Sequence, residues 1–209
     1  MEMYNTIIFD VDGTLIDTER AVLGSLQKML KIDYDFHYEL HELYFVLGIP
    51  GVYSLKELGV RDIAKAHARW EHFMKDFYHT IEVFGGITEL LVTLKQRNIN
   101  QGIVTSKTSQ ELQDDFVPFG LMDNLTHVVC ADDTLKHKPN PDPLLKYLEI
   151  SGADPKSSLY IGDTNYDYEC ARDAGVDFGL ALWGCKNHES IPAKYKLEQP
   201  IDVITLLTN

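Results

Sequence analysis

Five short apolar runs, each ended by a change to small, polar or acidic residues, constrain the fold of this chain most strongly. They are Ile7–Phe9, Gly102–Val104, Val128–Cys130, Leu159–Ile161 and Leu180–Leu182. The apolar character is continuous and does not alternate, which is typical of strands buried on both faces. Strands of this kind belong to parallel sheets, and parallel strands need crossover connections. The runs therefore predict a parallel sheet with helices between its strands.

Helical patterns separate these runs, as a parallel sheet requires. One apolar stripe is formed by Ile87, Leu90, Leu91 and Leu94, and another by Leu144, Leu145 and Leu148. Residues 165–174 are predicted to form a further helix, with Gly175 at its C-terminal cap. Alternating strands and helices predict an α/β fold with a doubly wound parallel sheet.

Residues 17–80 break the alternation, because they show helical periods and no clear strand. Val22, Leu26, Met29 and Leu30 share one helical face, and Ile63, Ala66, Trp70, Phe73 and Phe77 share another. The βα alternation resumes near Gly85-Gly86. We therefore expect an α/β core of residues 1–16 and 81–209, with an all-helical module of residues 17–80 inserted into it.

Charge and cysteine content narrow the partners and the compartment. The chain of 209 residues has 19 basic and 32 acidic side chains, a net charge of −13. Such a surface repels nucleic acid and anionic membranes, so neither is an expected partner. The three cysteines are widely spaced and form no CxxC pair. The N-terminus lacks the basic region of a signal peptide. Together these features predict a cytoplasmic protein.

The segment Asp10-Val11-Asp12-Gly13-Thr14 directly follows the first predicted strand. Side chains two residues apart in a strand point the same way, so Asp10 and Asp12 are expected to face one site. Neighbouring carboxylates raise one pKa, which suits one nucleophile or metal ligand and one general acid. The alternative is an Asp-Gly turn with two solvated carboxylates.

Further candidates follow other predicted strands, where the ligands of open α/β sheets bind. Thr105 and Ser106 precede a helix that starts near Thr108 or Ser109 and would form a phosphate cradle, although plain N-capping is an alternative. Asp163 and Asp167 are four residues apart and can address one cation, with helix capping as the alternative.

Lys138 lies in the proline-stiffened segment His137-Lys138-Pro139-Asn140-Pro141. A lone lysine is usually a solvated surface residue. Near several carboxylates and a bound phosphate, however, Lys138 would be the required counter-charge.

The four segments in this order resemble the haloacid dehalogenase superfamily of aspartyl-nucleophile phosphatases. The matching motifs are Asp10-x-Asp12-Gly13-Thr14, Thr105, Lys138-Pro139 and Gly162-Asp163-x-x-x-Asp167. The resemblance spans nearly the whole chain, and the inserted helices look like the C1 cap of that family. Within it, Leu47-Gly48-Ile49-Pro50 looks like the loop that reads the substrate.

The resemblance implies a role for each motif residue. Asp10 would be the nucleophile and Asp12 the acid and base. Thr105, Ser106 and Lys138 would bind phosphate. Mg²⁺ would be held by Asp10, the Asp12 carbonyl and Asp163, with support from Asp167. Mg²⁺ prefers such oxygen ligands and offsets the repulsion between a carboxylate and a phosphate.

The implied function is a Mg²⁺-dependent phosphomonoesterase that forms an aspartyl-phosphate on a small phosphorylated metabolite. The motifs are most similar to those of phosphoglycolate phosphatases and related pyrophosphatases, so phosphoglycolate is the first candidate substrate. A sugar-phosphate phosphatase or phosphomutase is an alternative. Mutases of this cap type use basic cap residues, and Ile49–Tyr53 offers none, although Lys56 is close. A non-catalytic ligand-binding protein is the alternative from another class. The sequence does not predict an oligomeric state.

Overall fold

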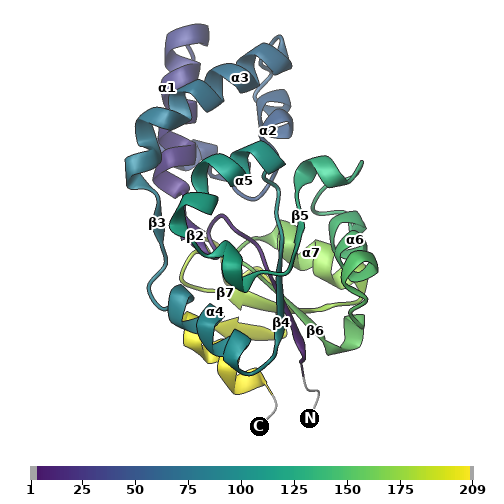
Figure 1. The fold of residues 1–209 in the computed structure, drawn as a ribbon. Helices are drawn as coiled ribbons and strands as arrows, with labels where there is room; N and C mark the ends of the chain where they lie inside the picture. The colour runs from purple at the N-terminus through teal and green to yellow at the C-terminus, as the bar shows by residue number, and fades with distance from the viewer. Residues whose placement is uncertain (1–3, 208–209) are drawn as a thin grey trace.

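The computed structural model describes residues 4–207, whose centre is a six-stranded parallel sheet (Figure 1). The strand order is β5-β4-β1-β6-β7-β8. The strands are β1 (Thr6–Phe9), β4 (Asn100–Val104), β5 (His127–Val129), β6 (Ser158–Gly162), β7 (Asp177–Ala181) and β8 (Tyr195–Leu197). Every neighbouring pair in this sheet is parallel. The predicted α/β class and doubly wound sheet are confirmed.

Apolar side chains of the central strands cover both faces of the sheet and pack into hydrophobic clusters. In β1, Ile7 and Phe9 contribute to the hydrophobic cluster that includes helix α4 (Ile87–Gln96). Ile8 points to the other face, into the cluster with helices α6 (Asp142–Ser151) and α7 (Asn165–Ala174). This division explains why the strand sequences are continuously apolar: neither face is left to water.

The core helices follow the predicted stripes with one exception. Ile87, Leu90, Leu91 and Leu94 of α4 are all fully buried. In α6, Leu144 is buried but Leu145 is 48% exposed, so placing Leu145 on the apolar stripe was wrong. After Leu144, the next fully buried residue of α6 is Tyr147. Helix α7 has its predicted bounds, and Gly175 ends it in the left-handed conformation.

Helices between β1 and α4 form a second body above the carboxyl end of the sheet (Figure 1). They are α1 (Glu19–Tyr34), η1 (Leu40–Val46), α2 (Gly51–Glu57), α3 (Ile63–Met74) and η2 (Lys75–Thr80). Their buried side chains make a separate hydrophobic cluster that includes Leu26, Leu43 and Trp70. A small antiparallel pair, β2 (Ile16–Asp17) and β3 (Glu82–Val83), joins this body to the core. The sequence patterns did not predict these two strands.

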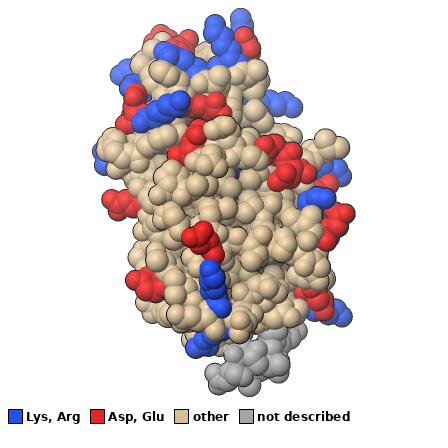
Figure 2. All heavy atoms as spheres, viewed as in Figure 1, with Lys and Arg blue, Asp and Glu red and all other residues tan. Residues whose placement is uncertain are grey.

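The remaining core elements are short. Helix α5 (Ser109–Asp115) follows β4, and brief 3₁₀ turns connect the other elements. These turns are η3 (Val117–Phe119), η4 (Met122–Asn124), η5 (Ala131–Asp133), η6 (Pro155–Ser157) and η7 (Pro200–Leu206). None of the helices described between residues 4 and 207 is long and apolar enough to cross a bilayer. On the face in Figure 2, Lys and Arg side chains are interspersed with Asp and Glu.

Candidate active site

The polar segments predicted from the sequence meet at the carboxyl end of the central strands. Asp10 directly follows β1, and Thr105 and Asp163 directly follow its two neighbours, β4 and β6. The main chain continues the sheet pairing at this edge, since the Asp10 N–H donates to the carbonyl of Ile161 at 2.8 Å. The strand order therefore brings three distant parts of the chain to one point.

Asp10, Asp163 and Asp167 form a buried carboxylate cluster with Lys138 beside it. One ligand oxygen from each of the three lies within 4.8 Å of the others. Lys138 Nζ is 3.0 Å from Asp10 Oδ1 and 2.6 Å from Asp167 Oδ1. All four side chains are at most 8% exposed. Lys138 is thus a buried counter-charge, and the alternative of a solvated surface lysine is wrong.

Burial shifts the pKa values in this cluster. It raises the pKa of Asp10 to about 7, although Lys138 opposes the shift. It also raises the pKa of Asp163 well above the usual range, and Asp167 and Asp10 add to that shift. Burial alone would lower the pKa of Lys138, but Asp10 and Asp167 outweigh it and raise that pKa. The lysine therefore stays charged beside Asp10, whose carboxyl burial drives towards its neutral form.

Asp167 is bound on all sides by protein groups. Its Oδ1 lies 2.9 Å from the Tyr160 hydroxyl as well as 2.6 Å from Lys138. Its Oδ2 accepts from the Thr164 N–H at 3.0 Å and from the Thr164 hydroxyl at 2.5 Å, which closes a capping box at the start of α7. Asp167 therefore performs the capping role that the sequence left open, and it also anchors Lys138.

The cluster suits a divalent cation. Asp10 Oδ1 is buried and faces Lys138 Nζ at 3.0 Å, and Asp163 receives a bond of 3.3 Å from the Thr14 hydroxyl. Three buried carboxylates face one ammonium group, which leaves negative charge that low dielectric makes costly. Carboxylate oxygens are the ligands that Mg²⁺ prefers. Gly13 leaves room for the Asp163 carboxylate, which a Cβ at that position would overlap.

Asp12 lies in a separate cluster, and the strand argument for it was wrong. Strand β1 ends at Phe9, so Asp10 and Asp12 are not alternate residues of one strand. Asp12 Oδ1 accepts from the Thr18 hydroxyl at 2.6 Å and lies 2.9 Å from Lys107 Nζ. Its side chain is outside the carboxylate cluster, but both aspartates line the same cavity. Asp12 faces that cavity because the loop after β1 turns.

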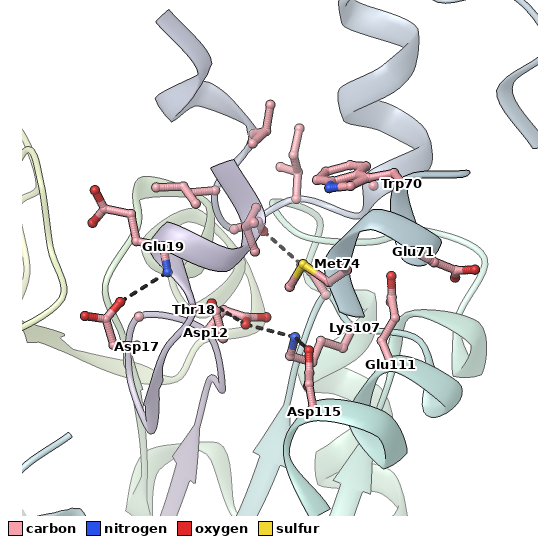
Figure 3. A pocket seen from close by; sticks show the side chains of 18 of the residues that line it. Asp12, Asp17, Thr18, Glu19, Trp70, Glu71, Met74, Lys107, Glu111 and Asp115 are labelled. Atoms are coloured by element: carbon pink, nitrogen blue, oxygen red, sulfur yellow. Dashed lines mark hydrogen bonds and ion pairs between the residues drawn. The ribbon is translucent and has the colours of Figure 1, made fainter. Parts of the chain in front are cut away.

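Lys107 joins Asp12 to helix α5. Its ammonium is 2.7 Å from Asp115 Oδ2, and its side chain is 7% exposed (Figure 3). Burial alone would lower the pKa of Lys107, but Asp12 and Asp115 outweigh it and raise that pKa. Burial raises the pKa of Asp115 to about 6. Asp12 is therefore held by a charged, buried lysine.

The predicted phosphate-binding residues lie at different depths. Thr105 is buried, and its hydroxyl accepts from the Lys107 N–H at 3.2 Å. Ser106 lines the cavity and donates to the Gly48 carbonyl of the helical body at 2.8 Å. The helix that follows begins at Ser109 with Thr108 as its N-cap, as predicted. The N-capping hydroxyl is thus Thr108, which leaves Thr105 and Ser106 for the site.

Four site residues were missed by the sequence analysis. They are Lys107, Asp115, Tyr160 and Thr18. Lys107 and Thr18 contact Asp12, Asp115 contacts Lys107, and Tyr160 contacts Asp167. Lys107 directly follows Thr105-Ser106, and that proximity was an available signal. Tyr160 is hidden in an apolar run. Nothing in the local sequence of Thr18 or Asp115 indicates their partners.

A cavity of about 640 Å³ lies above these residues, between the core and the helical body (Figure 3). The core contributes Asp10, Asp12, Ser106 and Asp163. The helical body contributes side chains from α1, from α3 and from the loop around Ile49. A ligand bound at Asp10 would therefore touch both bodies.

Comparisons with known proteins agree with this architecture. The chain is 27% identical over 212 residues to the pyrophosphatase PpaX of Bacillus cereus, which covers 98% of this chain and 97% of that protein. It is 29% identical to a phosphoglycolate phosphatase of Aquifex aeolicus, with coverages of 97% and 96%. A Lactobacillus plantarum crystal structure described as a candidate phosphoglycolate phosphatase superposes with a TM-score of 0.90 at 31% identity, covering 98% of this chain and all of that one.

The family model for haloacid dehalogenase-like hydrolases matches residues 7–181, which include Asp10, Lys138 and Asp167. This match covers most of the chain, and the Lactobacillus plantarum structure confirms the fold over nearly its full length. The resemblance inferred from the four motifs is therefore confirmed, and the chain belongs to the haloacid dehalogenase-like hydrolase family and is an enzyme.

Proposed function

We propose that this enzyme hydrolyses phosphate monoesters through an aspartyl-phosphate on Asp10. The observation that carries the proposal is the setting of the Asp10 carboxylate. It is buried, its Oδ1 lies 3.0 Å from Lys138 Nζ, and the side chain lines the cavity. A carboxylate that faces the cavity with a cation beside it can attack a phosphorus atom held there.

The steps follow from the positions of the side chains. An Asp10 oxygen forms a bond to phosphorus while the bond from phosphorus to the leaving oxygen breaks, and Asp12 gives its proton to that oxygen. Asp12 then takes a proton from water, which attacks the aspartyl-phosphate and releases phosphate with Asp10 regenerated. Lys138 offsets charge on the phosphoryl oxygens, and Thr105 and Ser106 bind them. Lys107 holds Asp12 in place for both transfers.

The divalent ion of this proposal is Mg²⁺. Asp10, Asp163 and the main-chain carbonyl of Asp12 would hold it, and Asp167 would support them through Lys138. When bound, Mg²⁺ supplies the positive charge that lets a carboxylate approach a phosphate. The unneutralised carboxylates of the cluster support this assignment.

The helical body is proposed to act as a cap. Residues 17–80 enter directly after Asp10–Thr14 and contribute to the cavity wall through Leu47, Gly48 and Ile49. A cap in this position excludes water during phosphoryl transfer and contacts the leaving group. The core would recognise the phosphate, and the cap would recognise the rest of the substrate.

The substrate is proposed to be a small phosphorylated metabolite, encountered in the cytoplasm. The names of the relatives make phosphoglycolate and pyrophosphate the first compounds to test. Sugar phosphates complete the panel. A phosphomutase remains the alternative, and a product analysis that finds isomerised ester in place of inorganic phosphate would favour it.

Phosphate release with Mg²⁺ tests the proposal directly. Asp10→Asn is expected to keep the thermal melting profile and to lose turnover by several powers of ten, because a nucleophile acts as part of a unit. Excess chelator should silence the wild-type enzyme, and Mg²⁺ should restore it. Near-normal kcat in Asp10→Asn would rule out the aspartyl-phosphate. A wild-type protein that binds phosphate esters without releasing phosphate would support the non-catalytic alternative.

A further inference from the structure

The wall of the cavity above Asp10 is strongly acidic, even beyond the proposed catalytic groups. Nine of the described lining residues are Asp or Glu, three are Lys and none is Arg. Six acids lie outside the proposed nucleophile, general acid and Mg²⁺ ligands: Asp17, Glu19, Glu71, Glu111, Asp114 and Asp115. These side chains line the same cavity as Asp10, into which the leaving group of a substrate would extend.

Two of the three lining lysines already have carboxylate partners. Lys107 lies between Asp12 and Asp115, at 2.9 and 2.7 Å. Lys186 forms an ion pair with Glu19. The third, Lys75, is exposed at the start of η2. Lys138 contacts Asp10 and Asp167 below the cavity and serves the phosphate. An anionic leaving group would therefore meet little unpaired positive charge.

Two histidines, His72 and His67, also line the cavity and can carry positive charge. His67 lies between two of the acids. Its Nδ1 is 3.3 Å from Glu71 Oε1, and its Nε2 is 3.6 Å from Glu111 Oε1. The two glutamates belong to α3 and α5, and their carboxylate oxygens lie within 4.8 Å of each other on the same side of the cavity (Figure 3). Even a protonated His67 is shared by two carboxylates, so this part of the wall stays negative.

Uncharged surface makes up much of the remaining wall. Trp70 and Met74 of α3 and Ile49 of the cap loop all line the cavity. An uncharged carbon skeleton can pack against such surface, because no charged group loses its water in the process. A carboxylate or second phosphate in the same place would lose its hydration and face carboxylates, and like charges placed together in an interface disfavour binding.

We propose that the leaving group of the substrate carries no negative charge and is an uncharged or ammonium-bearing alcohol. The inference rests on the proposed phosphatase function and refines it. It places phosphoglycolate and pyrophosphate, each of which has a second anionic group, below neutral and cationic monoesters as substrates. Relatives with those names would then differ from this enzyme in the part of the cavity that reads the leaving group.

Three esters of nearly equal size test the charge rule. They are phosphoglycolate, 2-hydroxyethyl phosphate and phosphoethanolamine, whose leaving groups end in a carboxylate, a hydroxyl and an ammonium group. With Mg²⁺, kcat/KM for phosphoglycolate is expected to be lower than for the other two by about tenfold or more. Added salt should reduce this difference, because it screens charges. Equal values, or a preference for phosphoglycolate, would overturn the inference.

Two variants test whether the acidic lining residues cause the difference in kcat/KM between the neutral ester and phosphoglycolate. Glu71→Gln combined with Asp114→Asn removes two lining charges and should narrow the ratio between the neutral ester and phosphoglycolate by about threefold. Glu57→Gln removes one negative charge at an exposed position of α2 outside the lining, and it should leave the ratio unchanged. An unaltered ratio in the double variant would count against the inference.

Hydrolysis of p-nitrophenyl phosphate checks the proposed function separately from the charge rule. If the wild-type protein hydrolyses no ester, calorimetric binding of the same three esters with Mg²⁺ still decides the charge rule. Weaker binding of phosphoglycolate would support the rule while the phosphatase proposal fails. Equal or tighter binding of phosphoglycolate, or no binding of any of the three, would overturn the rule.

Discussion

Lys107 links the proposed acid Asp12 to helix α5 through Asp115, and its ammonium is buried between the two. Lys107→Met would leave the Asp12 side chain held by the Thr18 hydroxyl without its ion pair. Misplacing a reacting group by about 1 Å can cost 100-fold. We therefore expect kcat/KM for alkyl phosphates to fall by about two powers of ten. Aryl phosphates should lose much less, because their leaving groups need no proton.

A comparison of kcat/KM for ethyl and p-nitrophenyl phosphate measures this effect. Lys146→Met is the matched control, since Lys146 is an exposed lysine of α6 paired with Glu149. It should leave both values unchanged. Equal losses for the two esters in Lys107→Met would show that Lys107 does not act through Asp12.

The raised pKa of Asp10 has a consequence for stability. Unfolded Asp10 ionises near pH 4, whereas burial raises its pKa in the native protein to about 7. Between these values the native state binds a proton that the unfolded state has lost. The contribution of Asp10 to the free energy of unfolding is therefore full below about pH 4 and is lost as pH rises towards 7.

Asp10→Asn should remove this part of the pH dependence. Urea unfolding of both proteins between pH 4 and 8, in chelator, measures the slopes. The wild-type free energy of unfolding should fall more steeply with rising pH than that of the variant. Parallel curves would show that the native pKa of Asp10 is not raised.

Most residues of the proposed site could be predicted from the sequence, because they follow predicted strands. Asp10, Thr105 and Asp163 each end a buried strand, and parallel strands bring their carboxyl ends to one edge. Asp115 could not be predicted, because it contacts Lys107 only after α5 folds back over the loop that follows β4. Tyr160 was missed since its ring satisfies the apolar pattern while its hydroxyl reaches Asp167.

At the scale of elements, the loop before α2 is the part of the helical body that reaches the core. Ile49 lines the cavity, and its neighbour Gly48 accepts a hydrogen bond from Ser106. Gly48 itself has a φ of +87°, and a Cβ there would press on Thr164, so it is unsuited to substitution. Ile49 is the better position at which to test the role of this loop.

Ile49→Ala is expected to change kcat/KM unequally across different phosphate esters, because it removes apolar surface near the leaving group. Inhibition by inorganic phosphate, which needs only the core, should change little. Ile32→Ala is the matched control, since Ile32 is 57% exposed on α1 outside the cavity lining. A uniform loss for all esters and for phosphate would make the loop a structural support only.

Elements with a strong period could be predicted, and short ones could not. The strands β1 and β6 carry buried apolar runs, β4 ends in Ile103-Val104, and α4 has an unbroken apolar stripe, whereas α7 was predicted with Gly175 at its C-terminal cap. The pair β2–β3 joins residues far apart in the chain, and each of its strands has two residues, while β8 has three. So short a segment has no period to detect.

At the scale of the whole molecule, a bound cation should stabilise the fold. A ligand that binds only the native state adds free energy of unfolding, about 2.7 kcal/mol at 100 times its Kd. Mg²⁺ should therefore raise Tm, and Asp163→Asn should abolish the rise. Asp123→Asn, at an exposed position of η4, should keep it. A melting temperature that is unaffected by Mg²⁺ would argue against the carboxylate cluster as its site.

The pairing of Asp17 with Glu82 and of Ile16 with Val83 means that the chain leaves the core and returns to it side by side. Paired residues of an antiparallel ladder lie about 5 Å apart. Evolution could therefore lengthen, shorten or exchange everything between these points without altering how β1 connects to α4. Descendants of one ancestral core can then inherit the same bond-breaking residues while they acquire different partners for them.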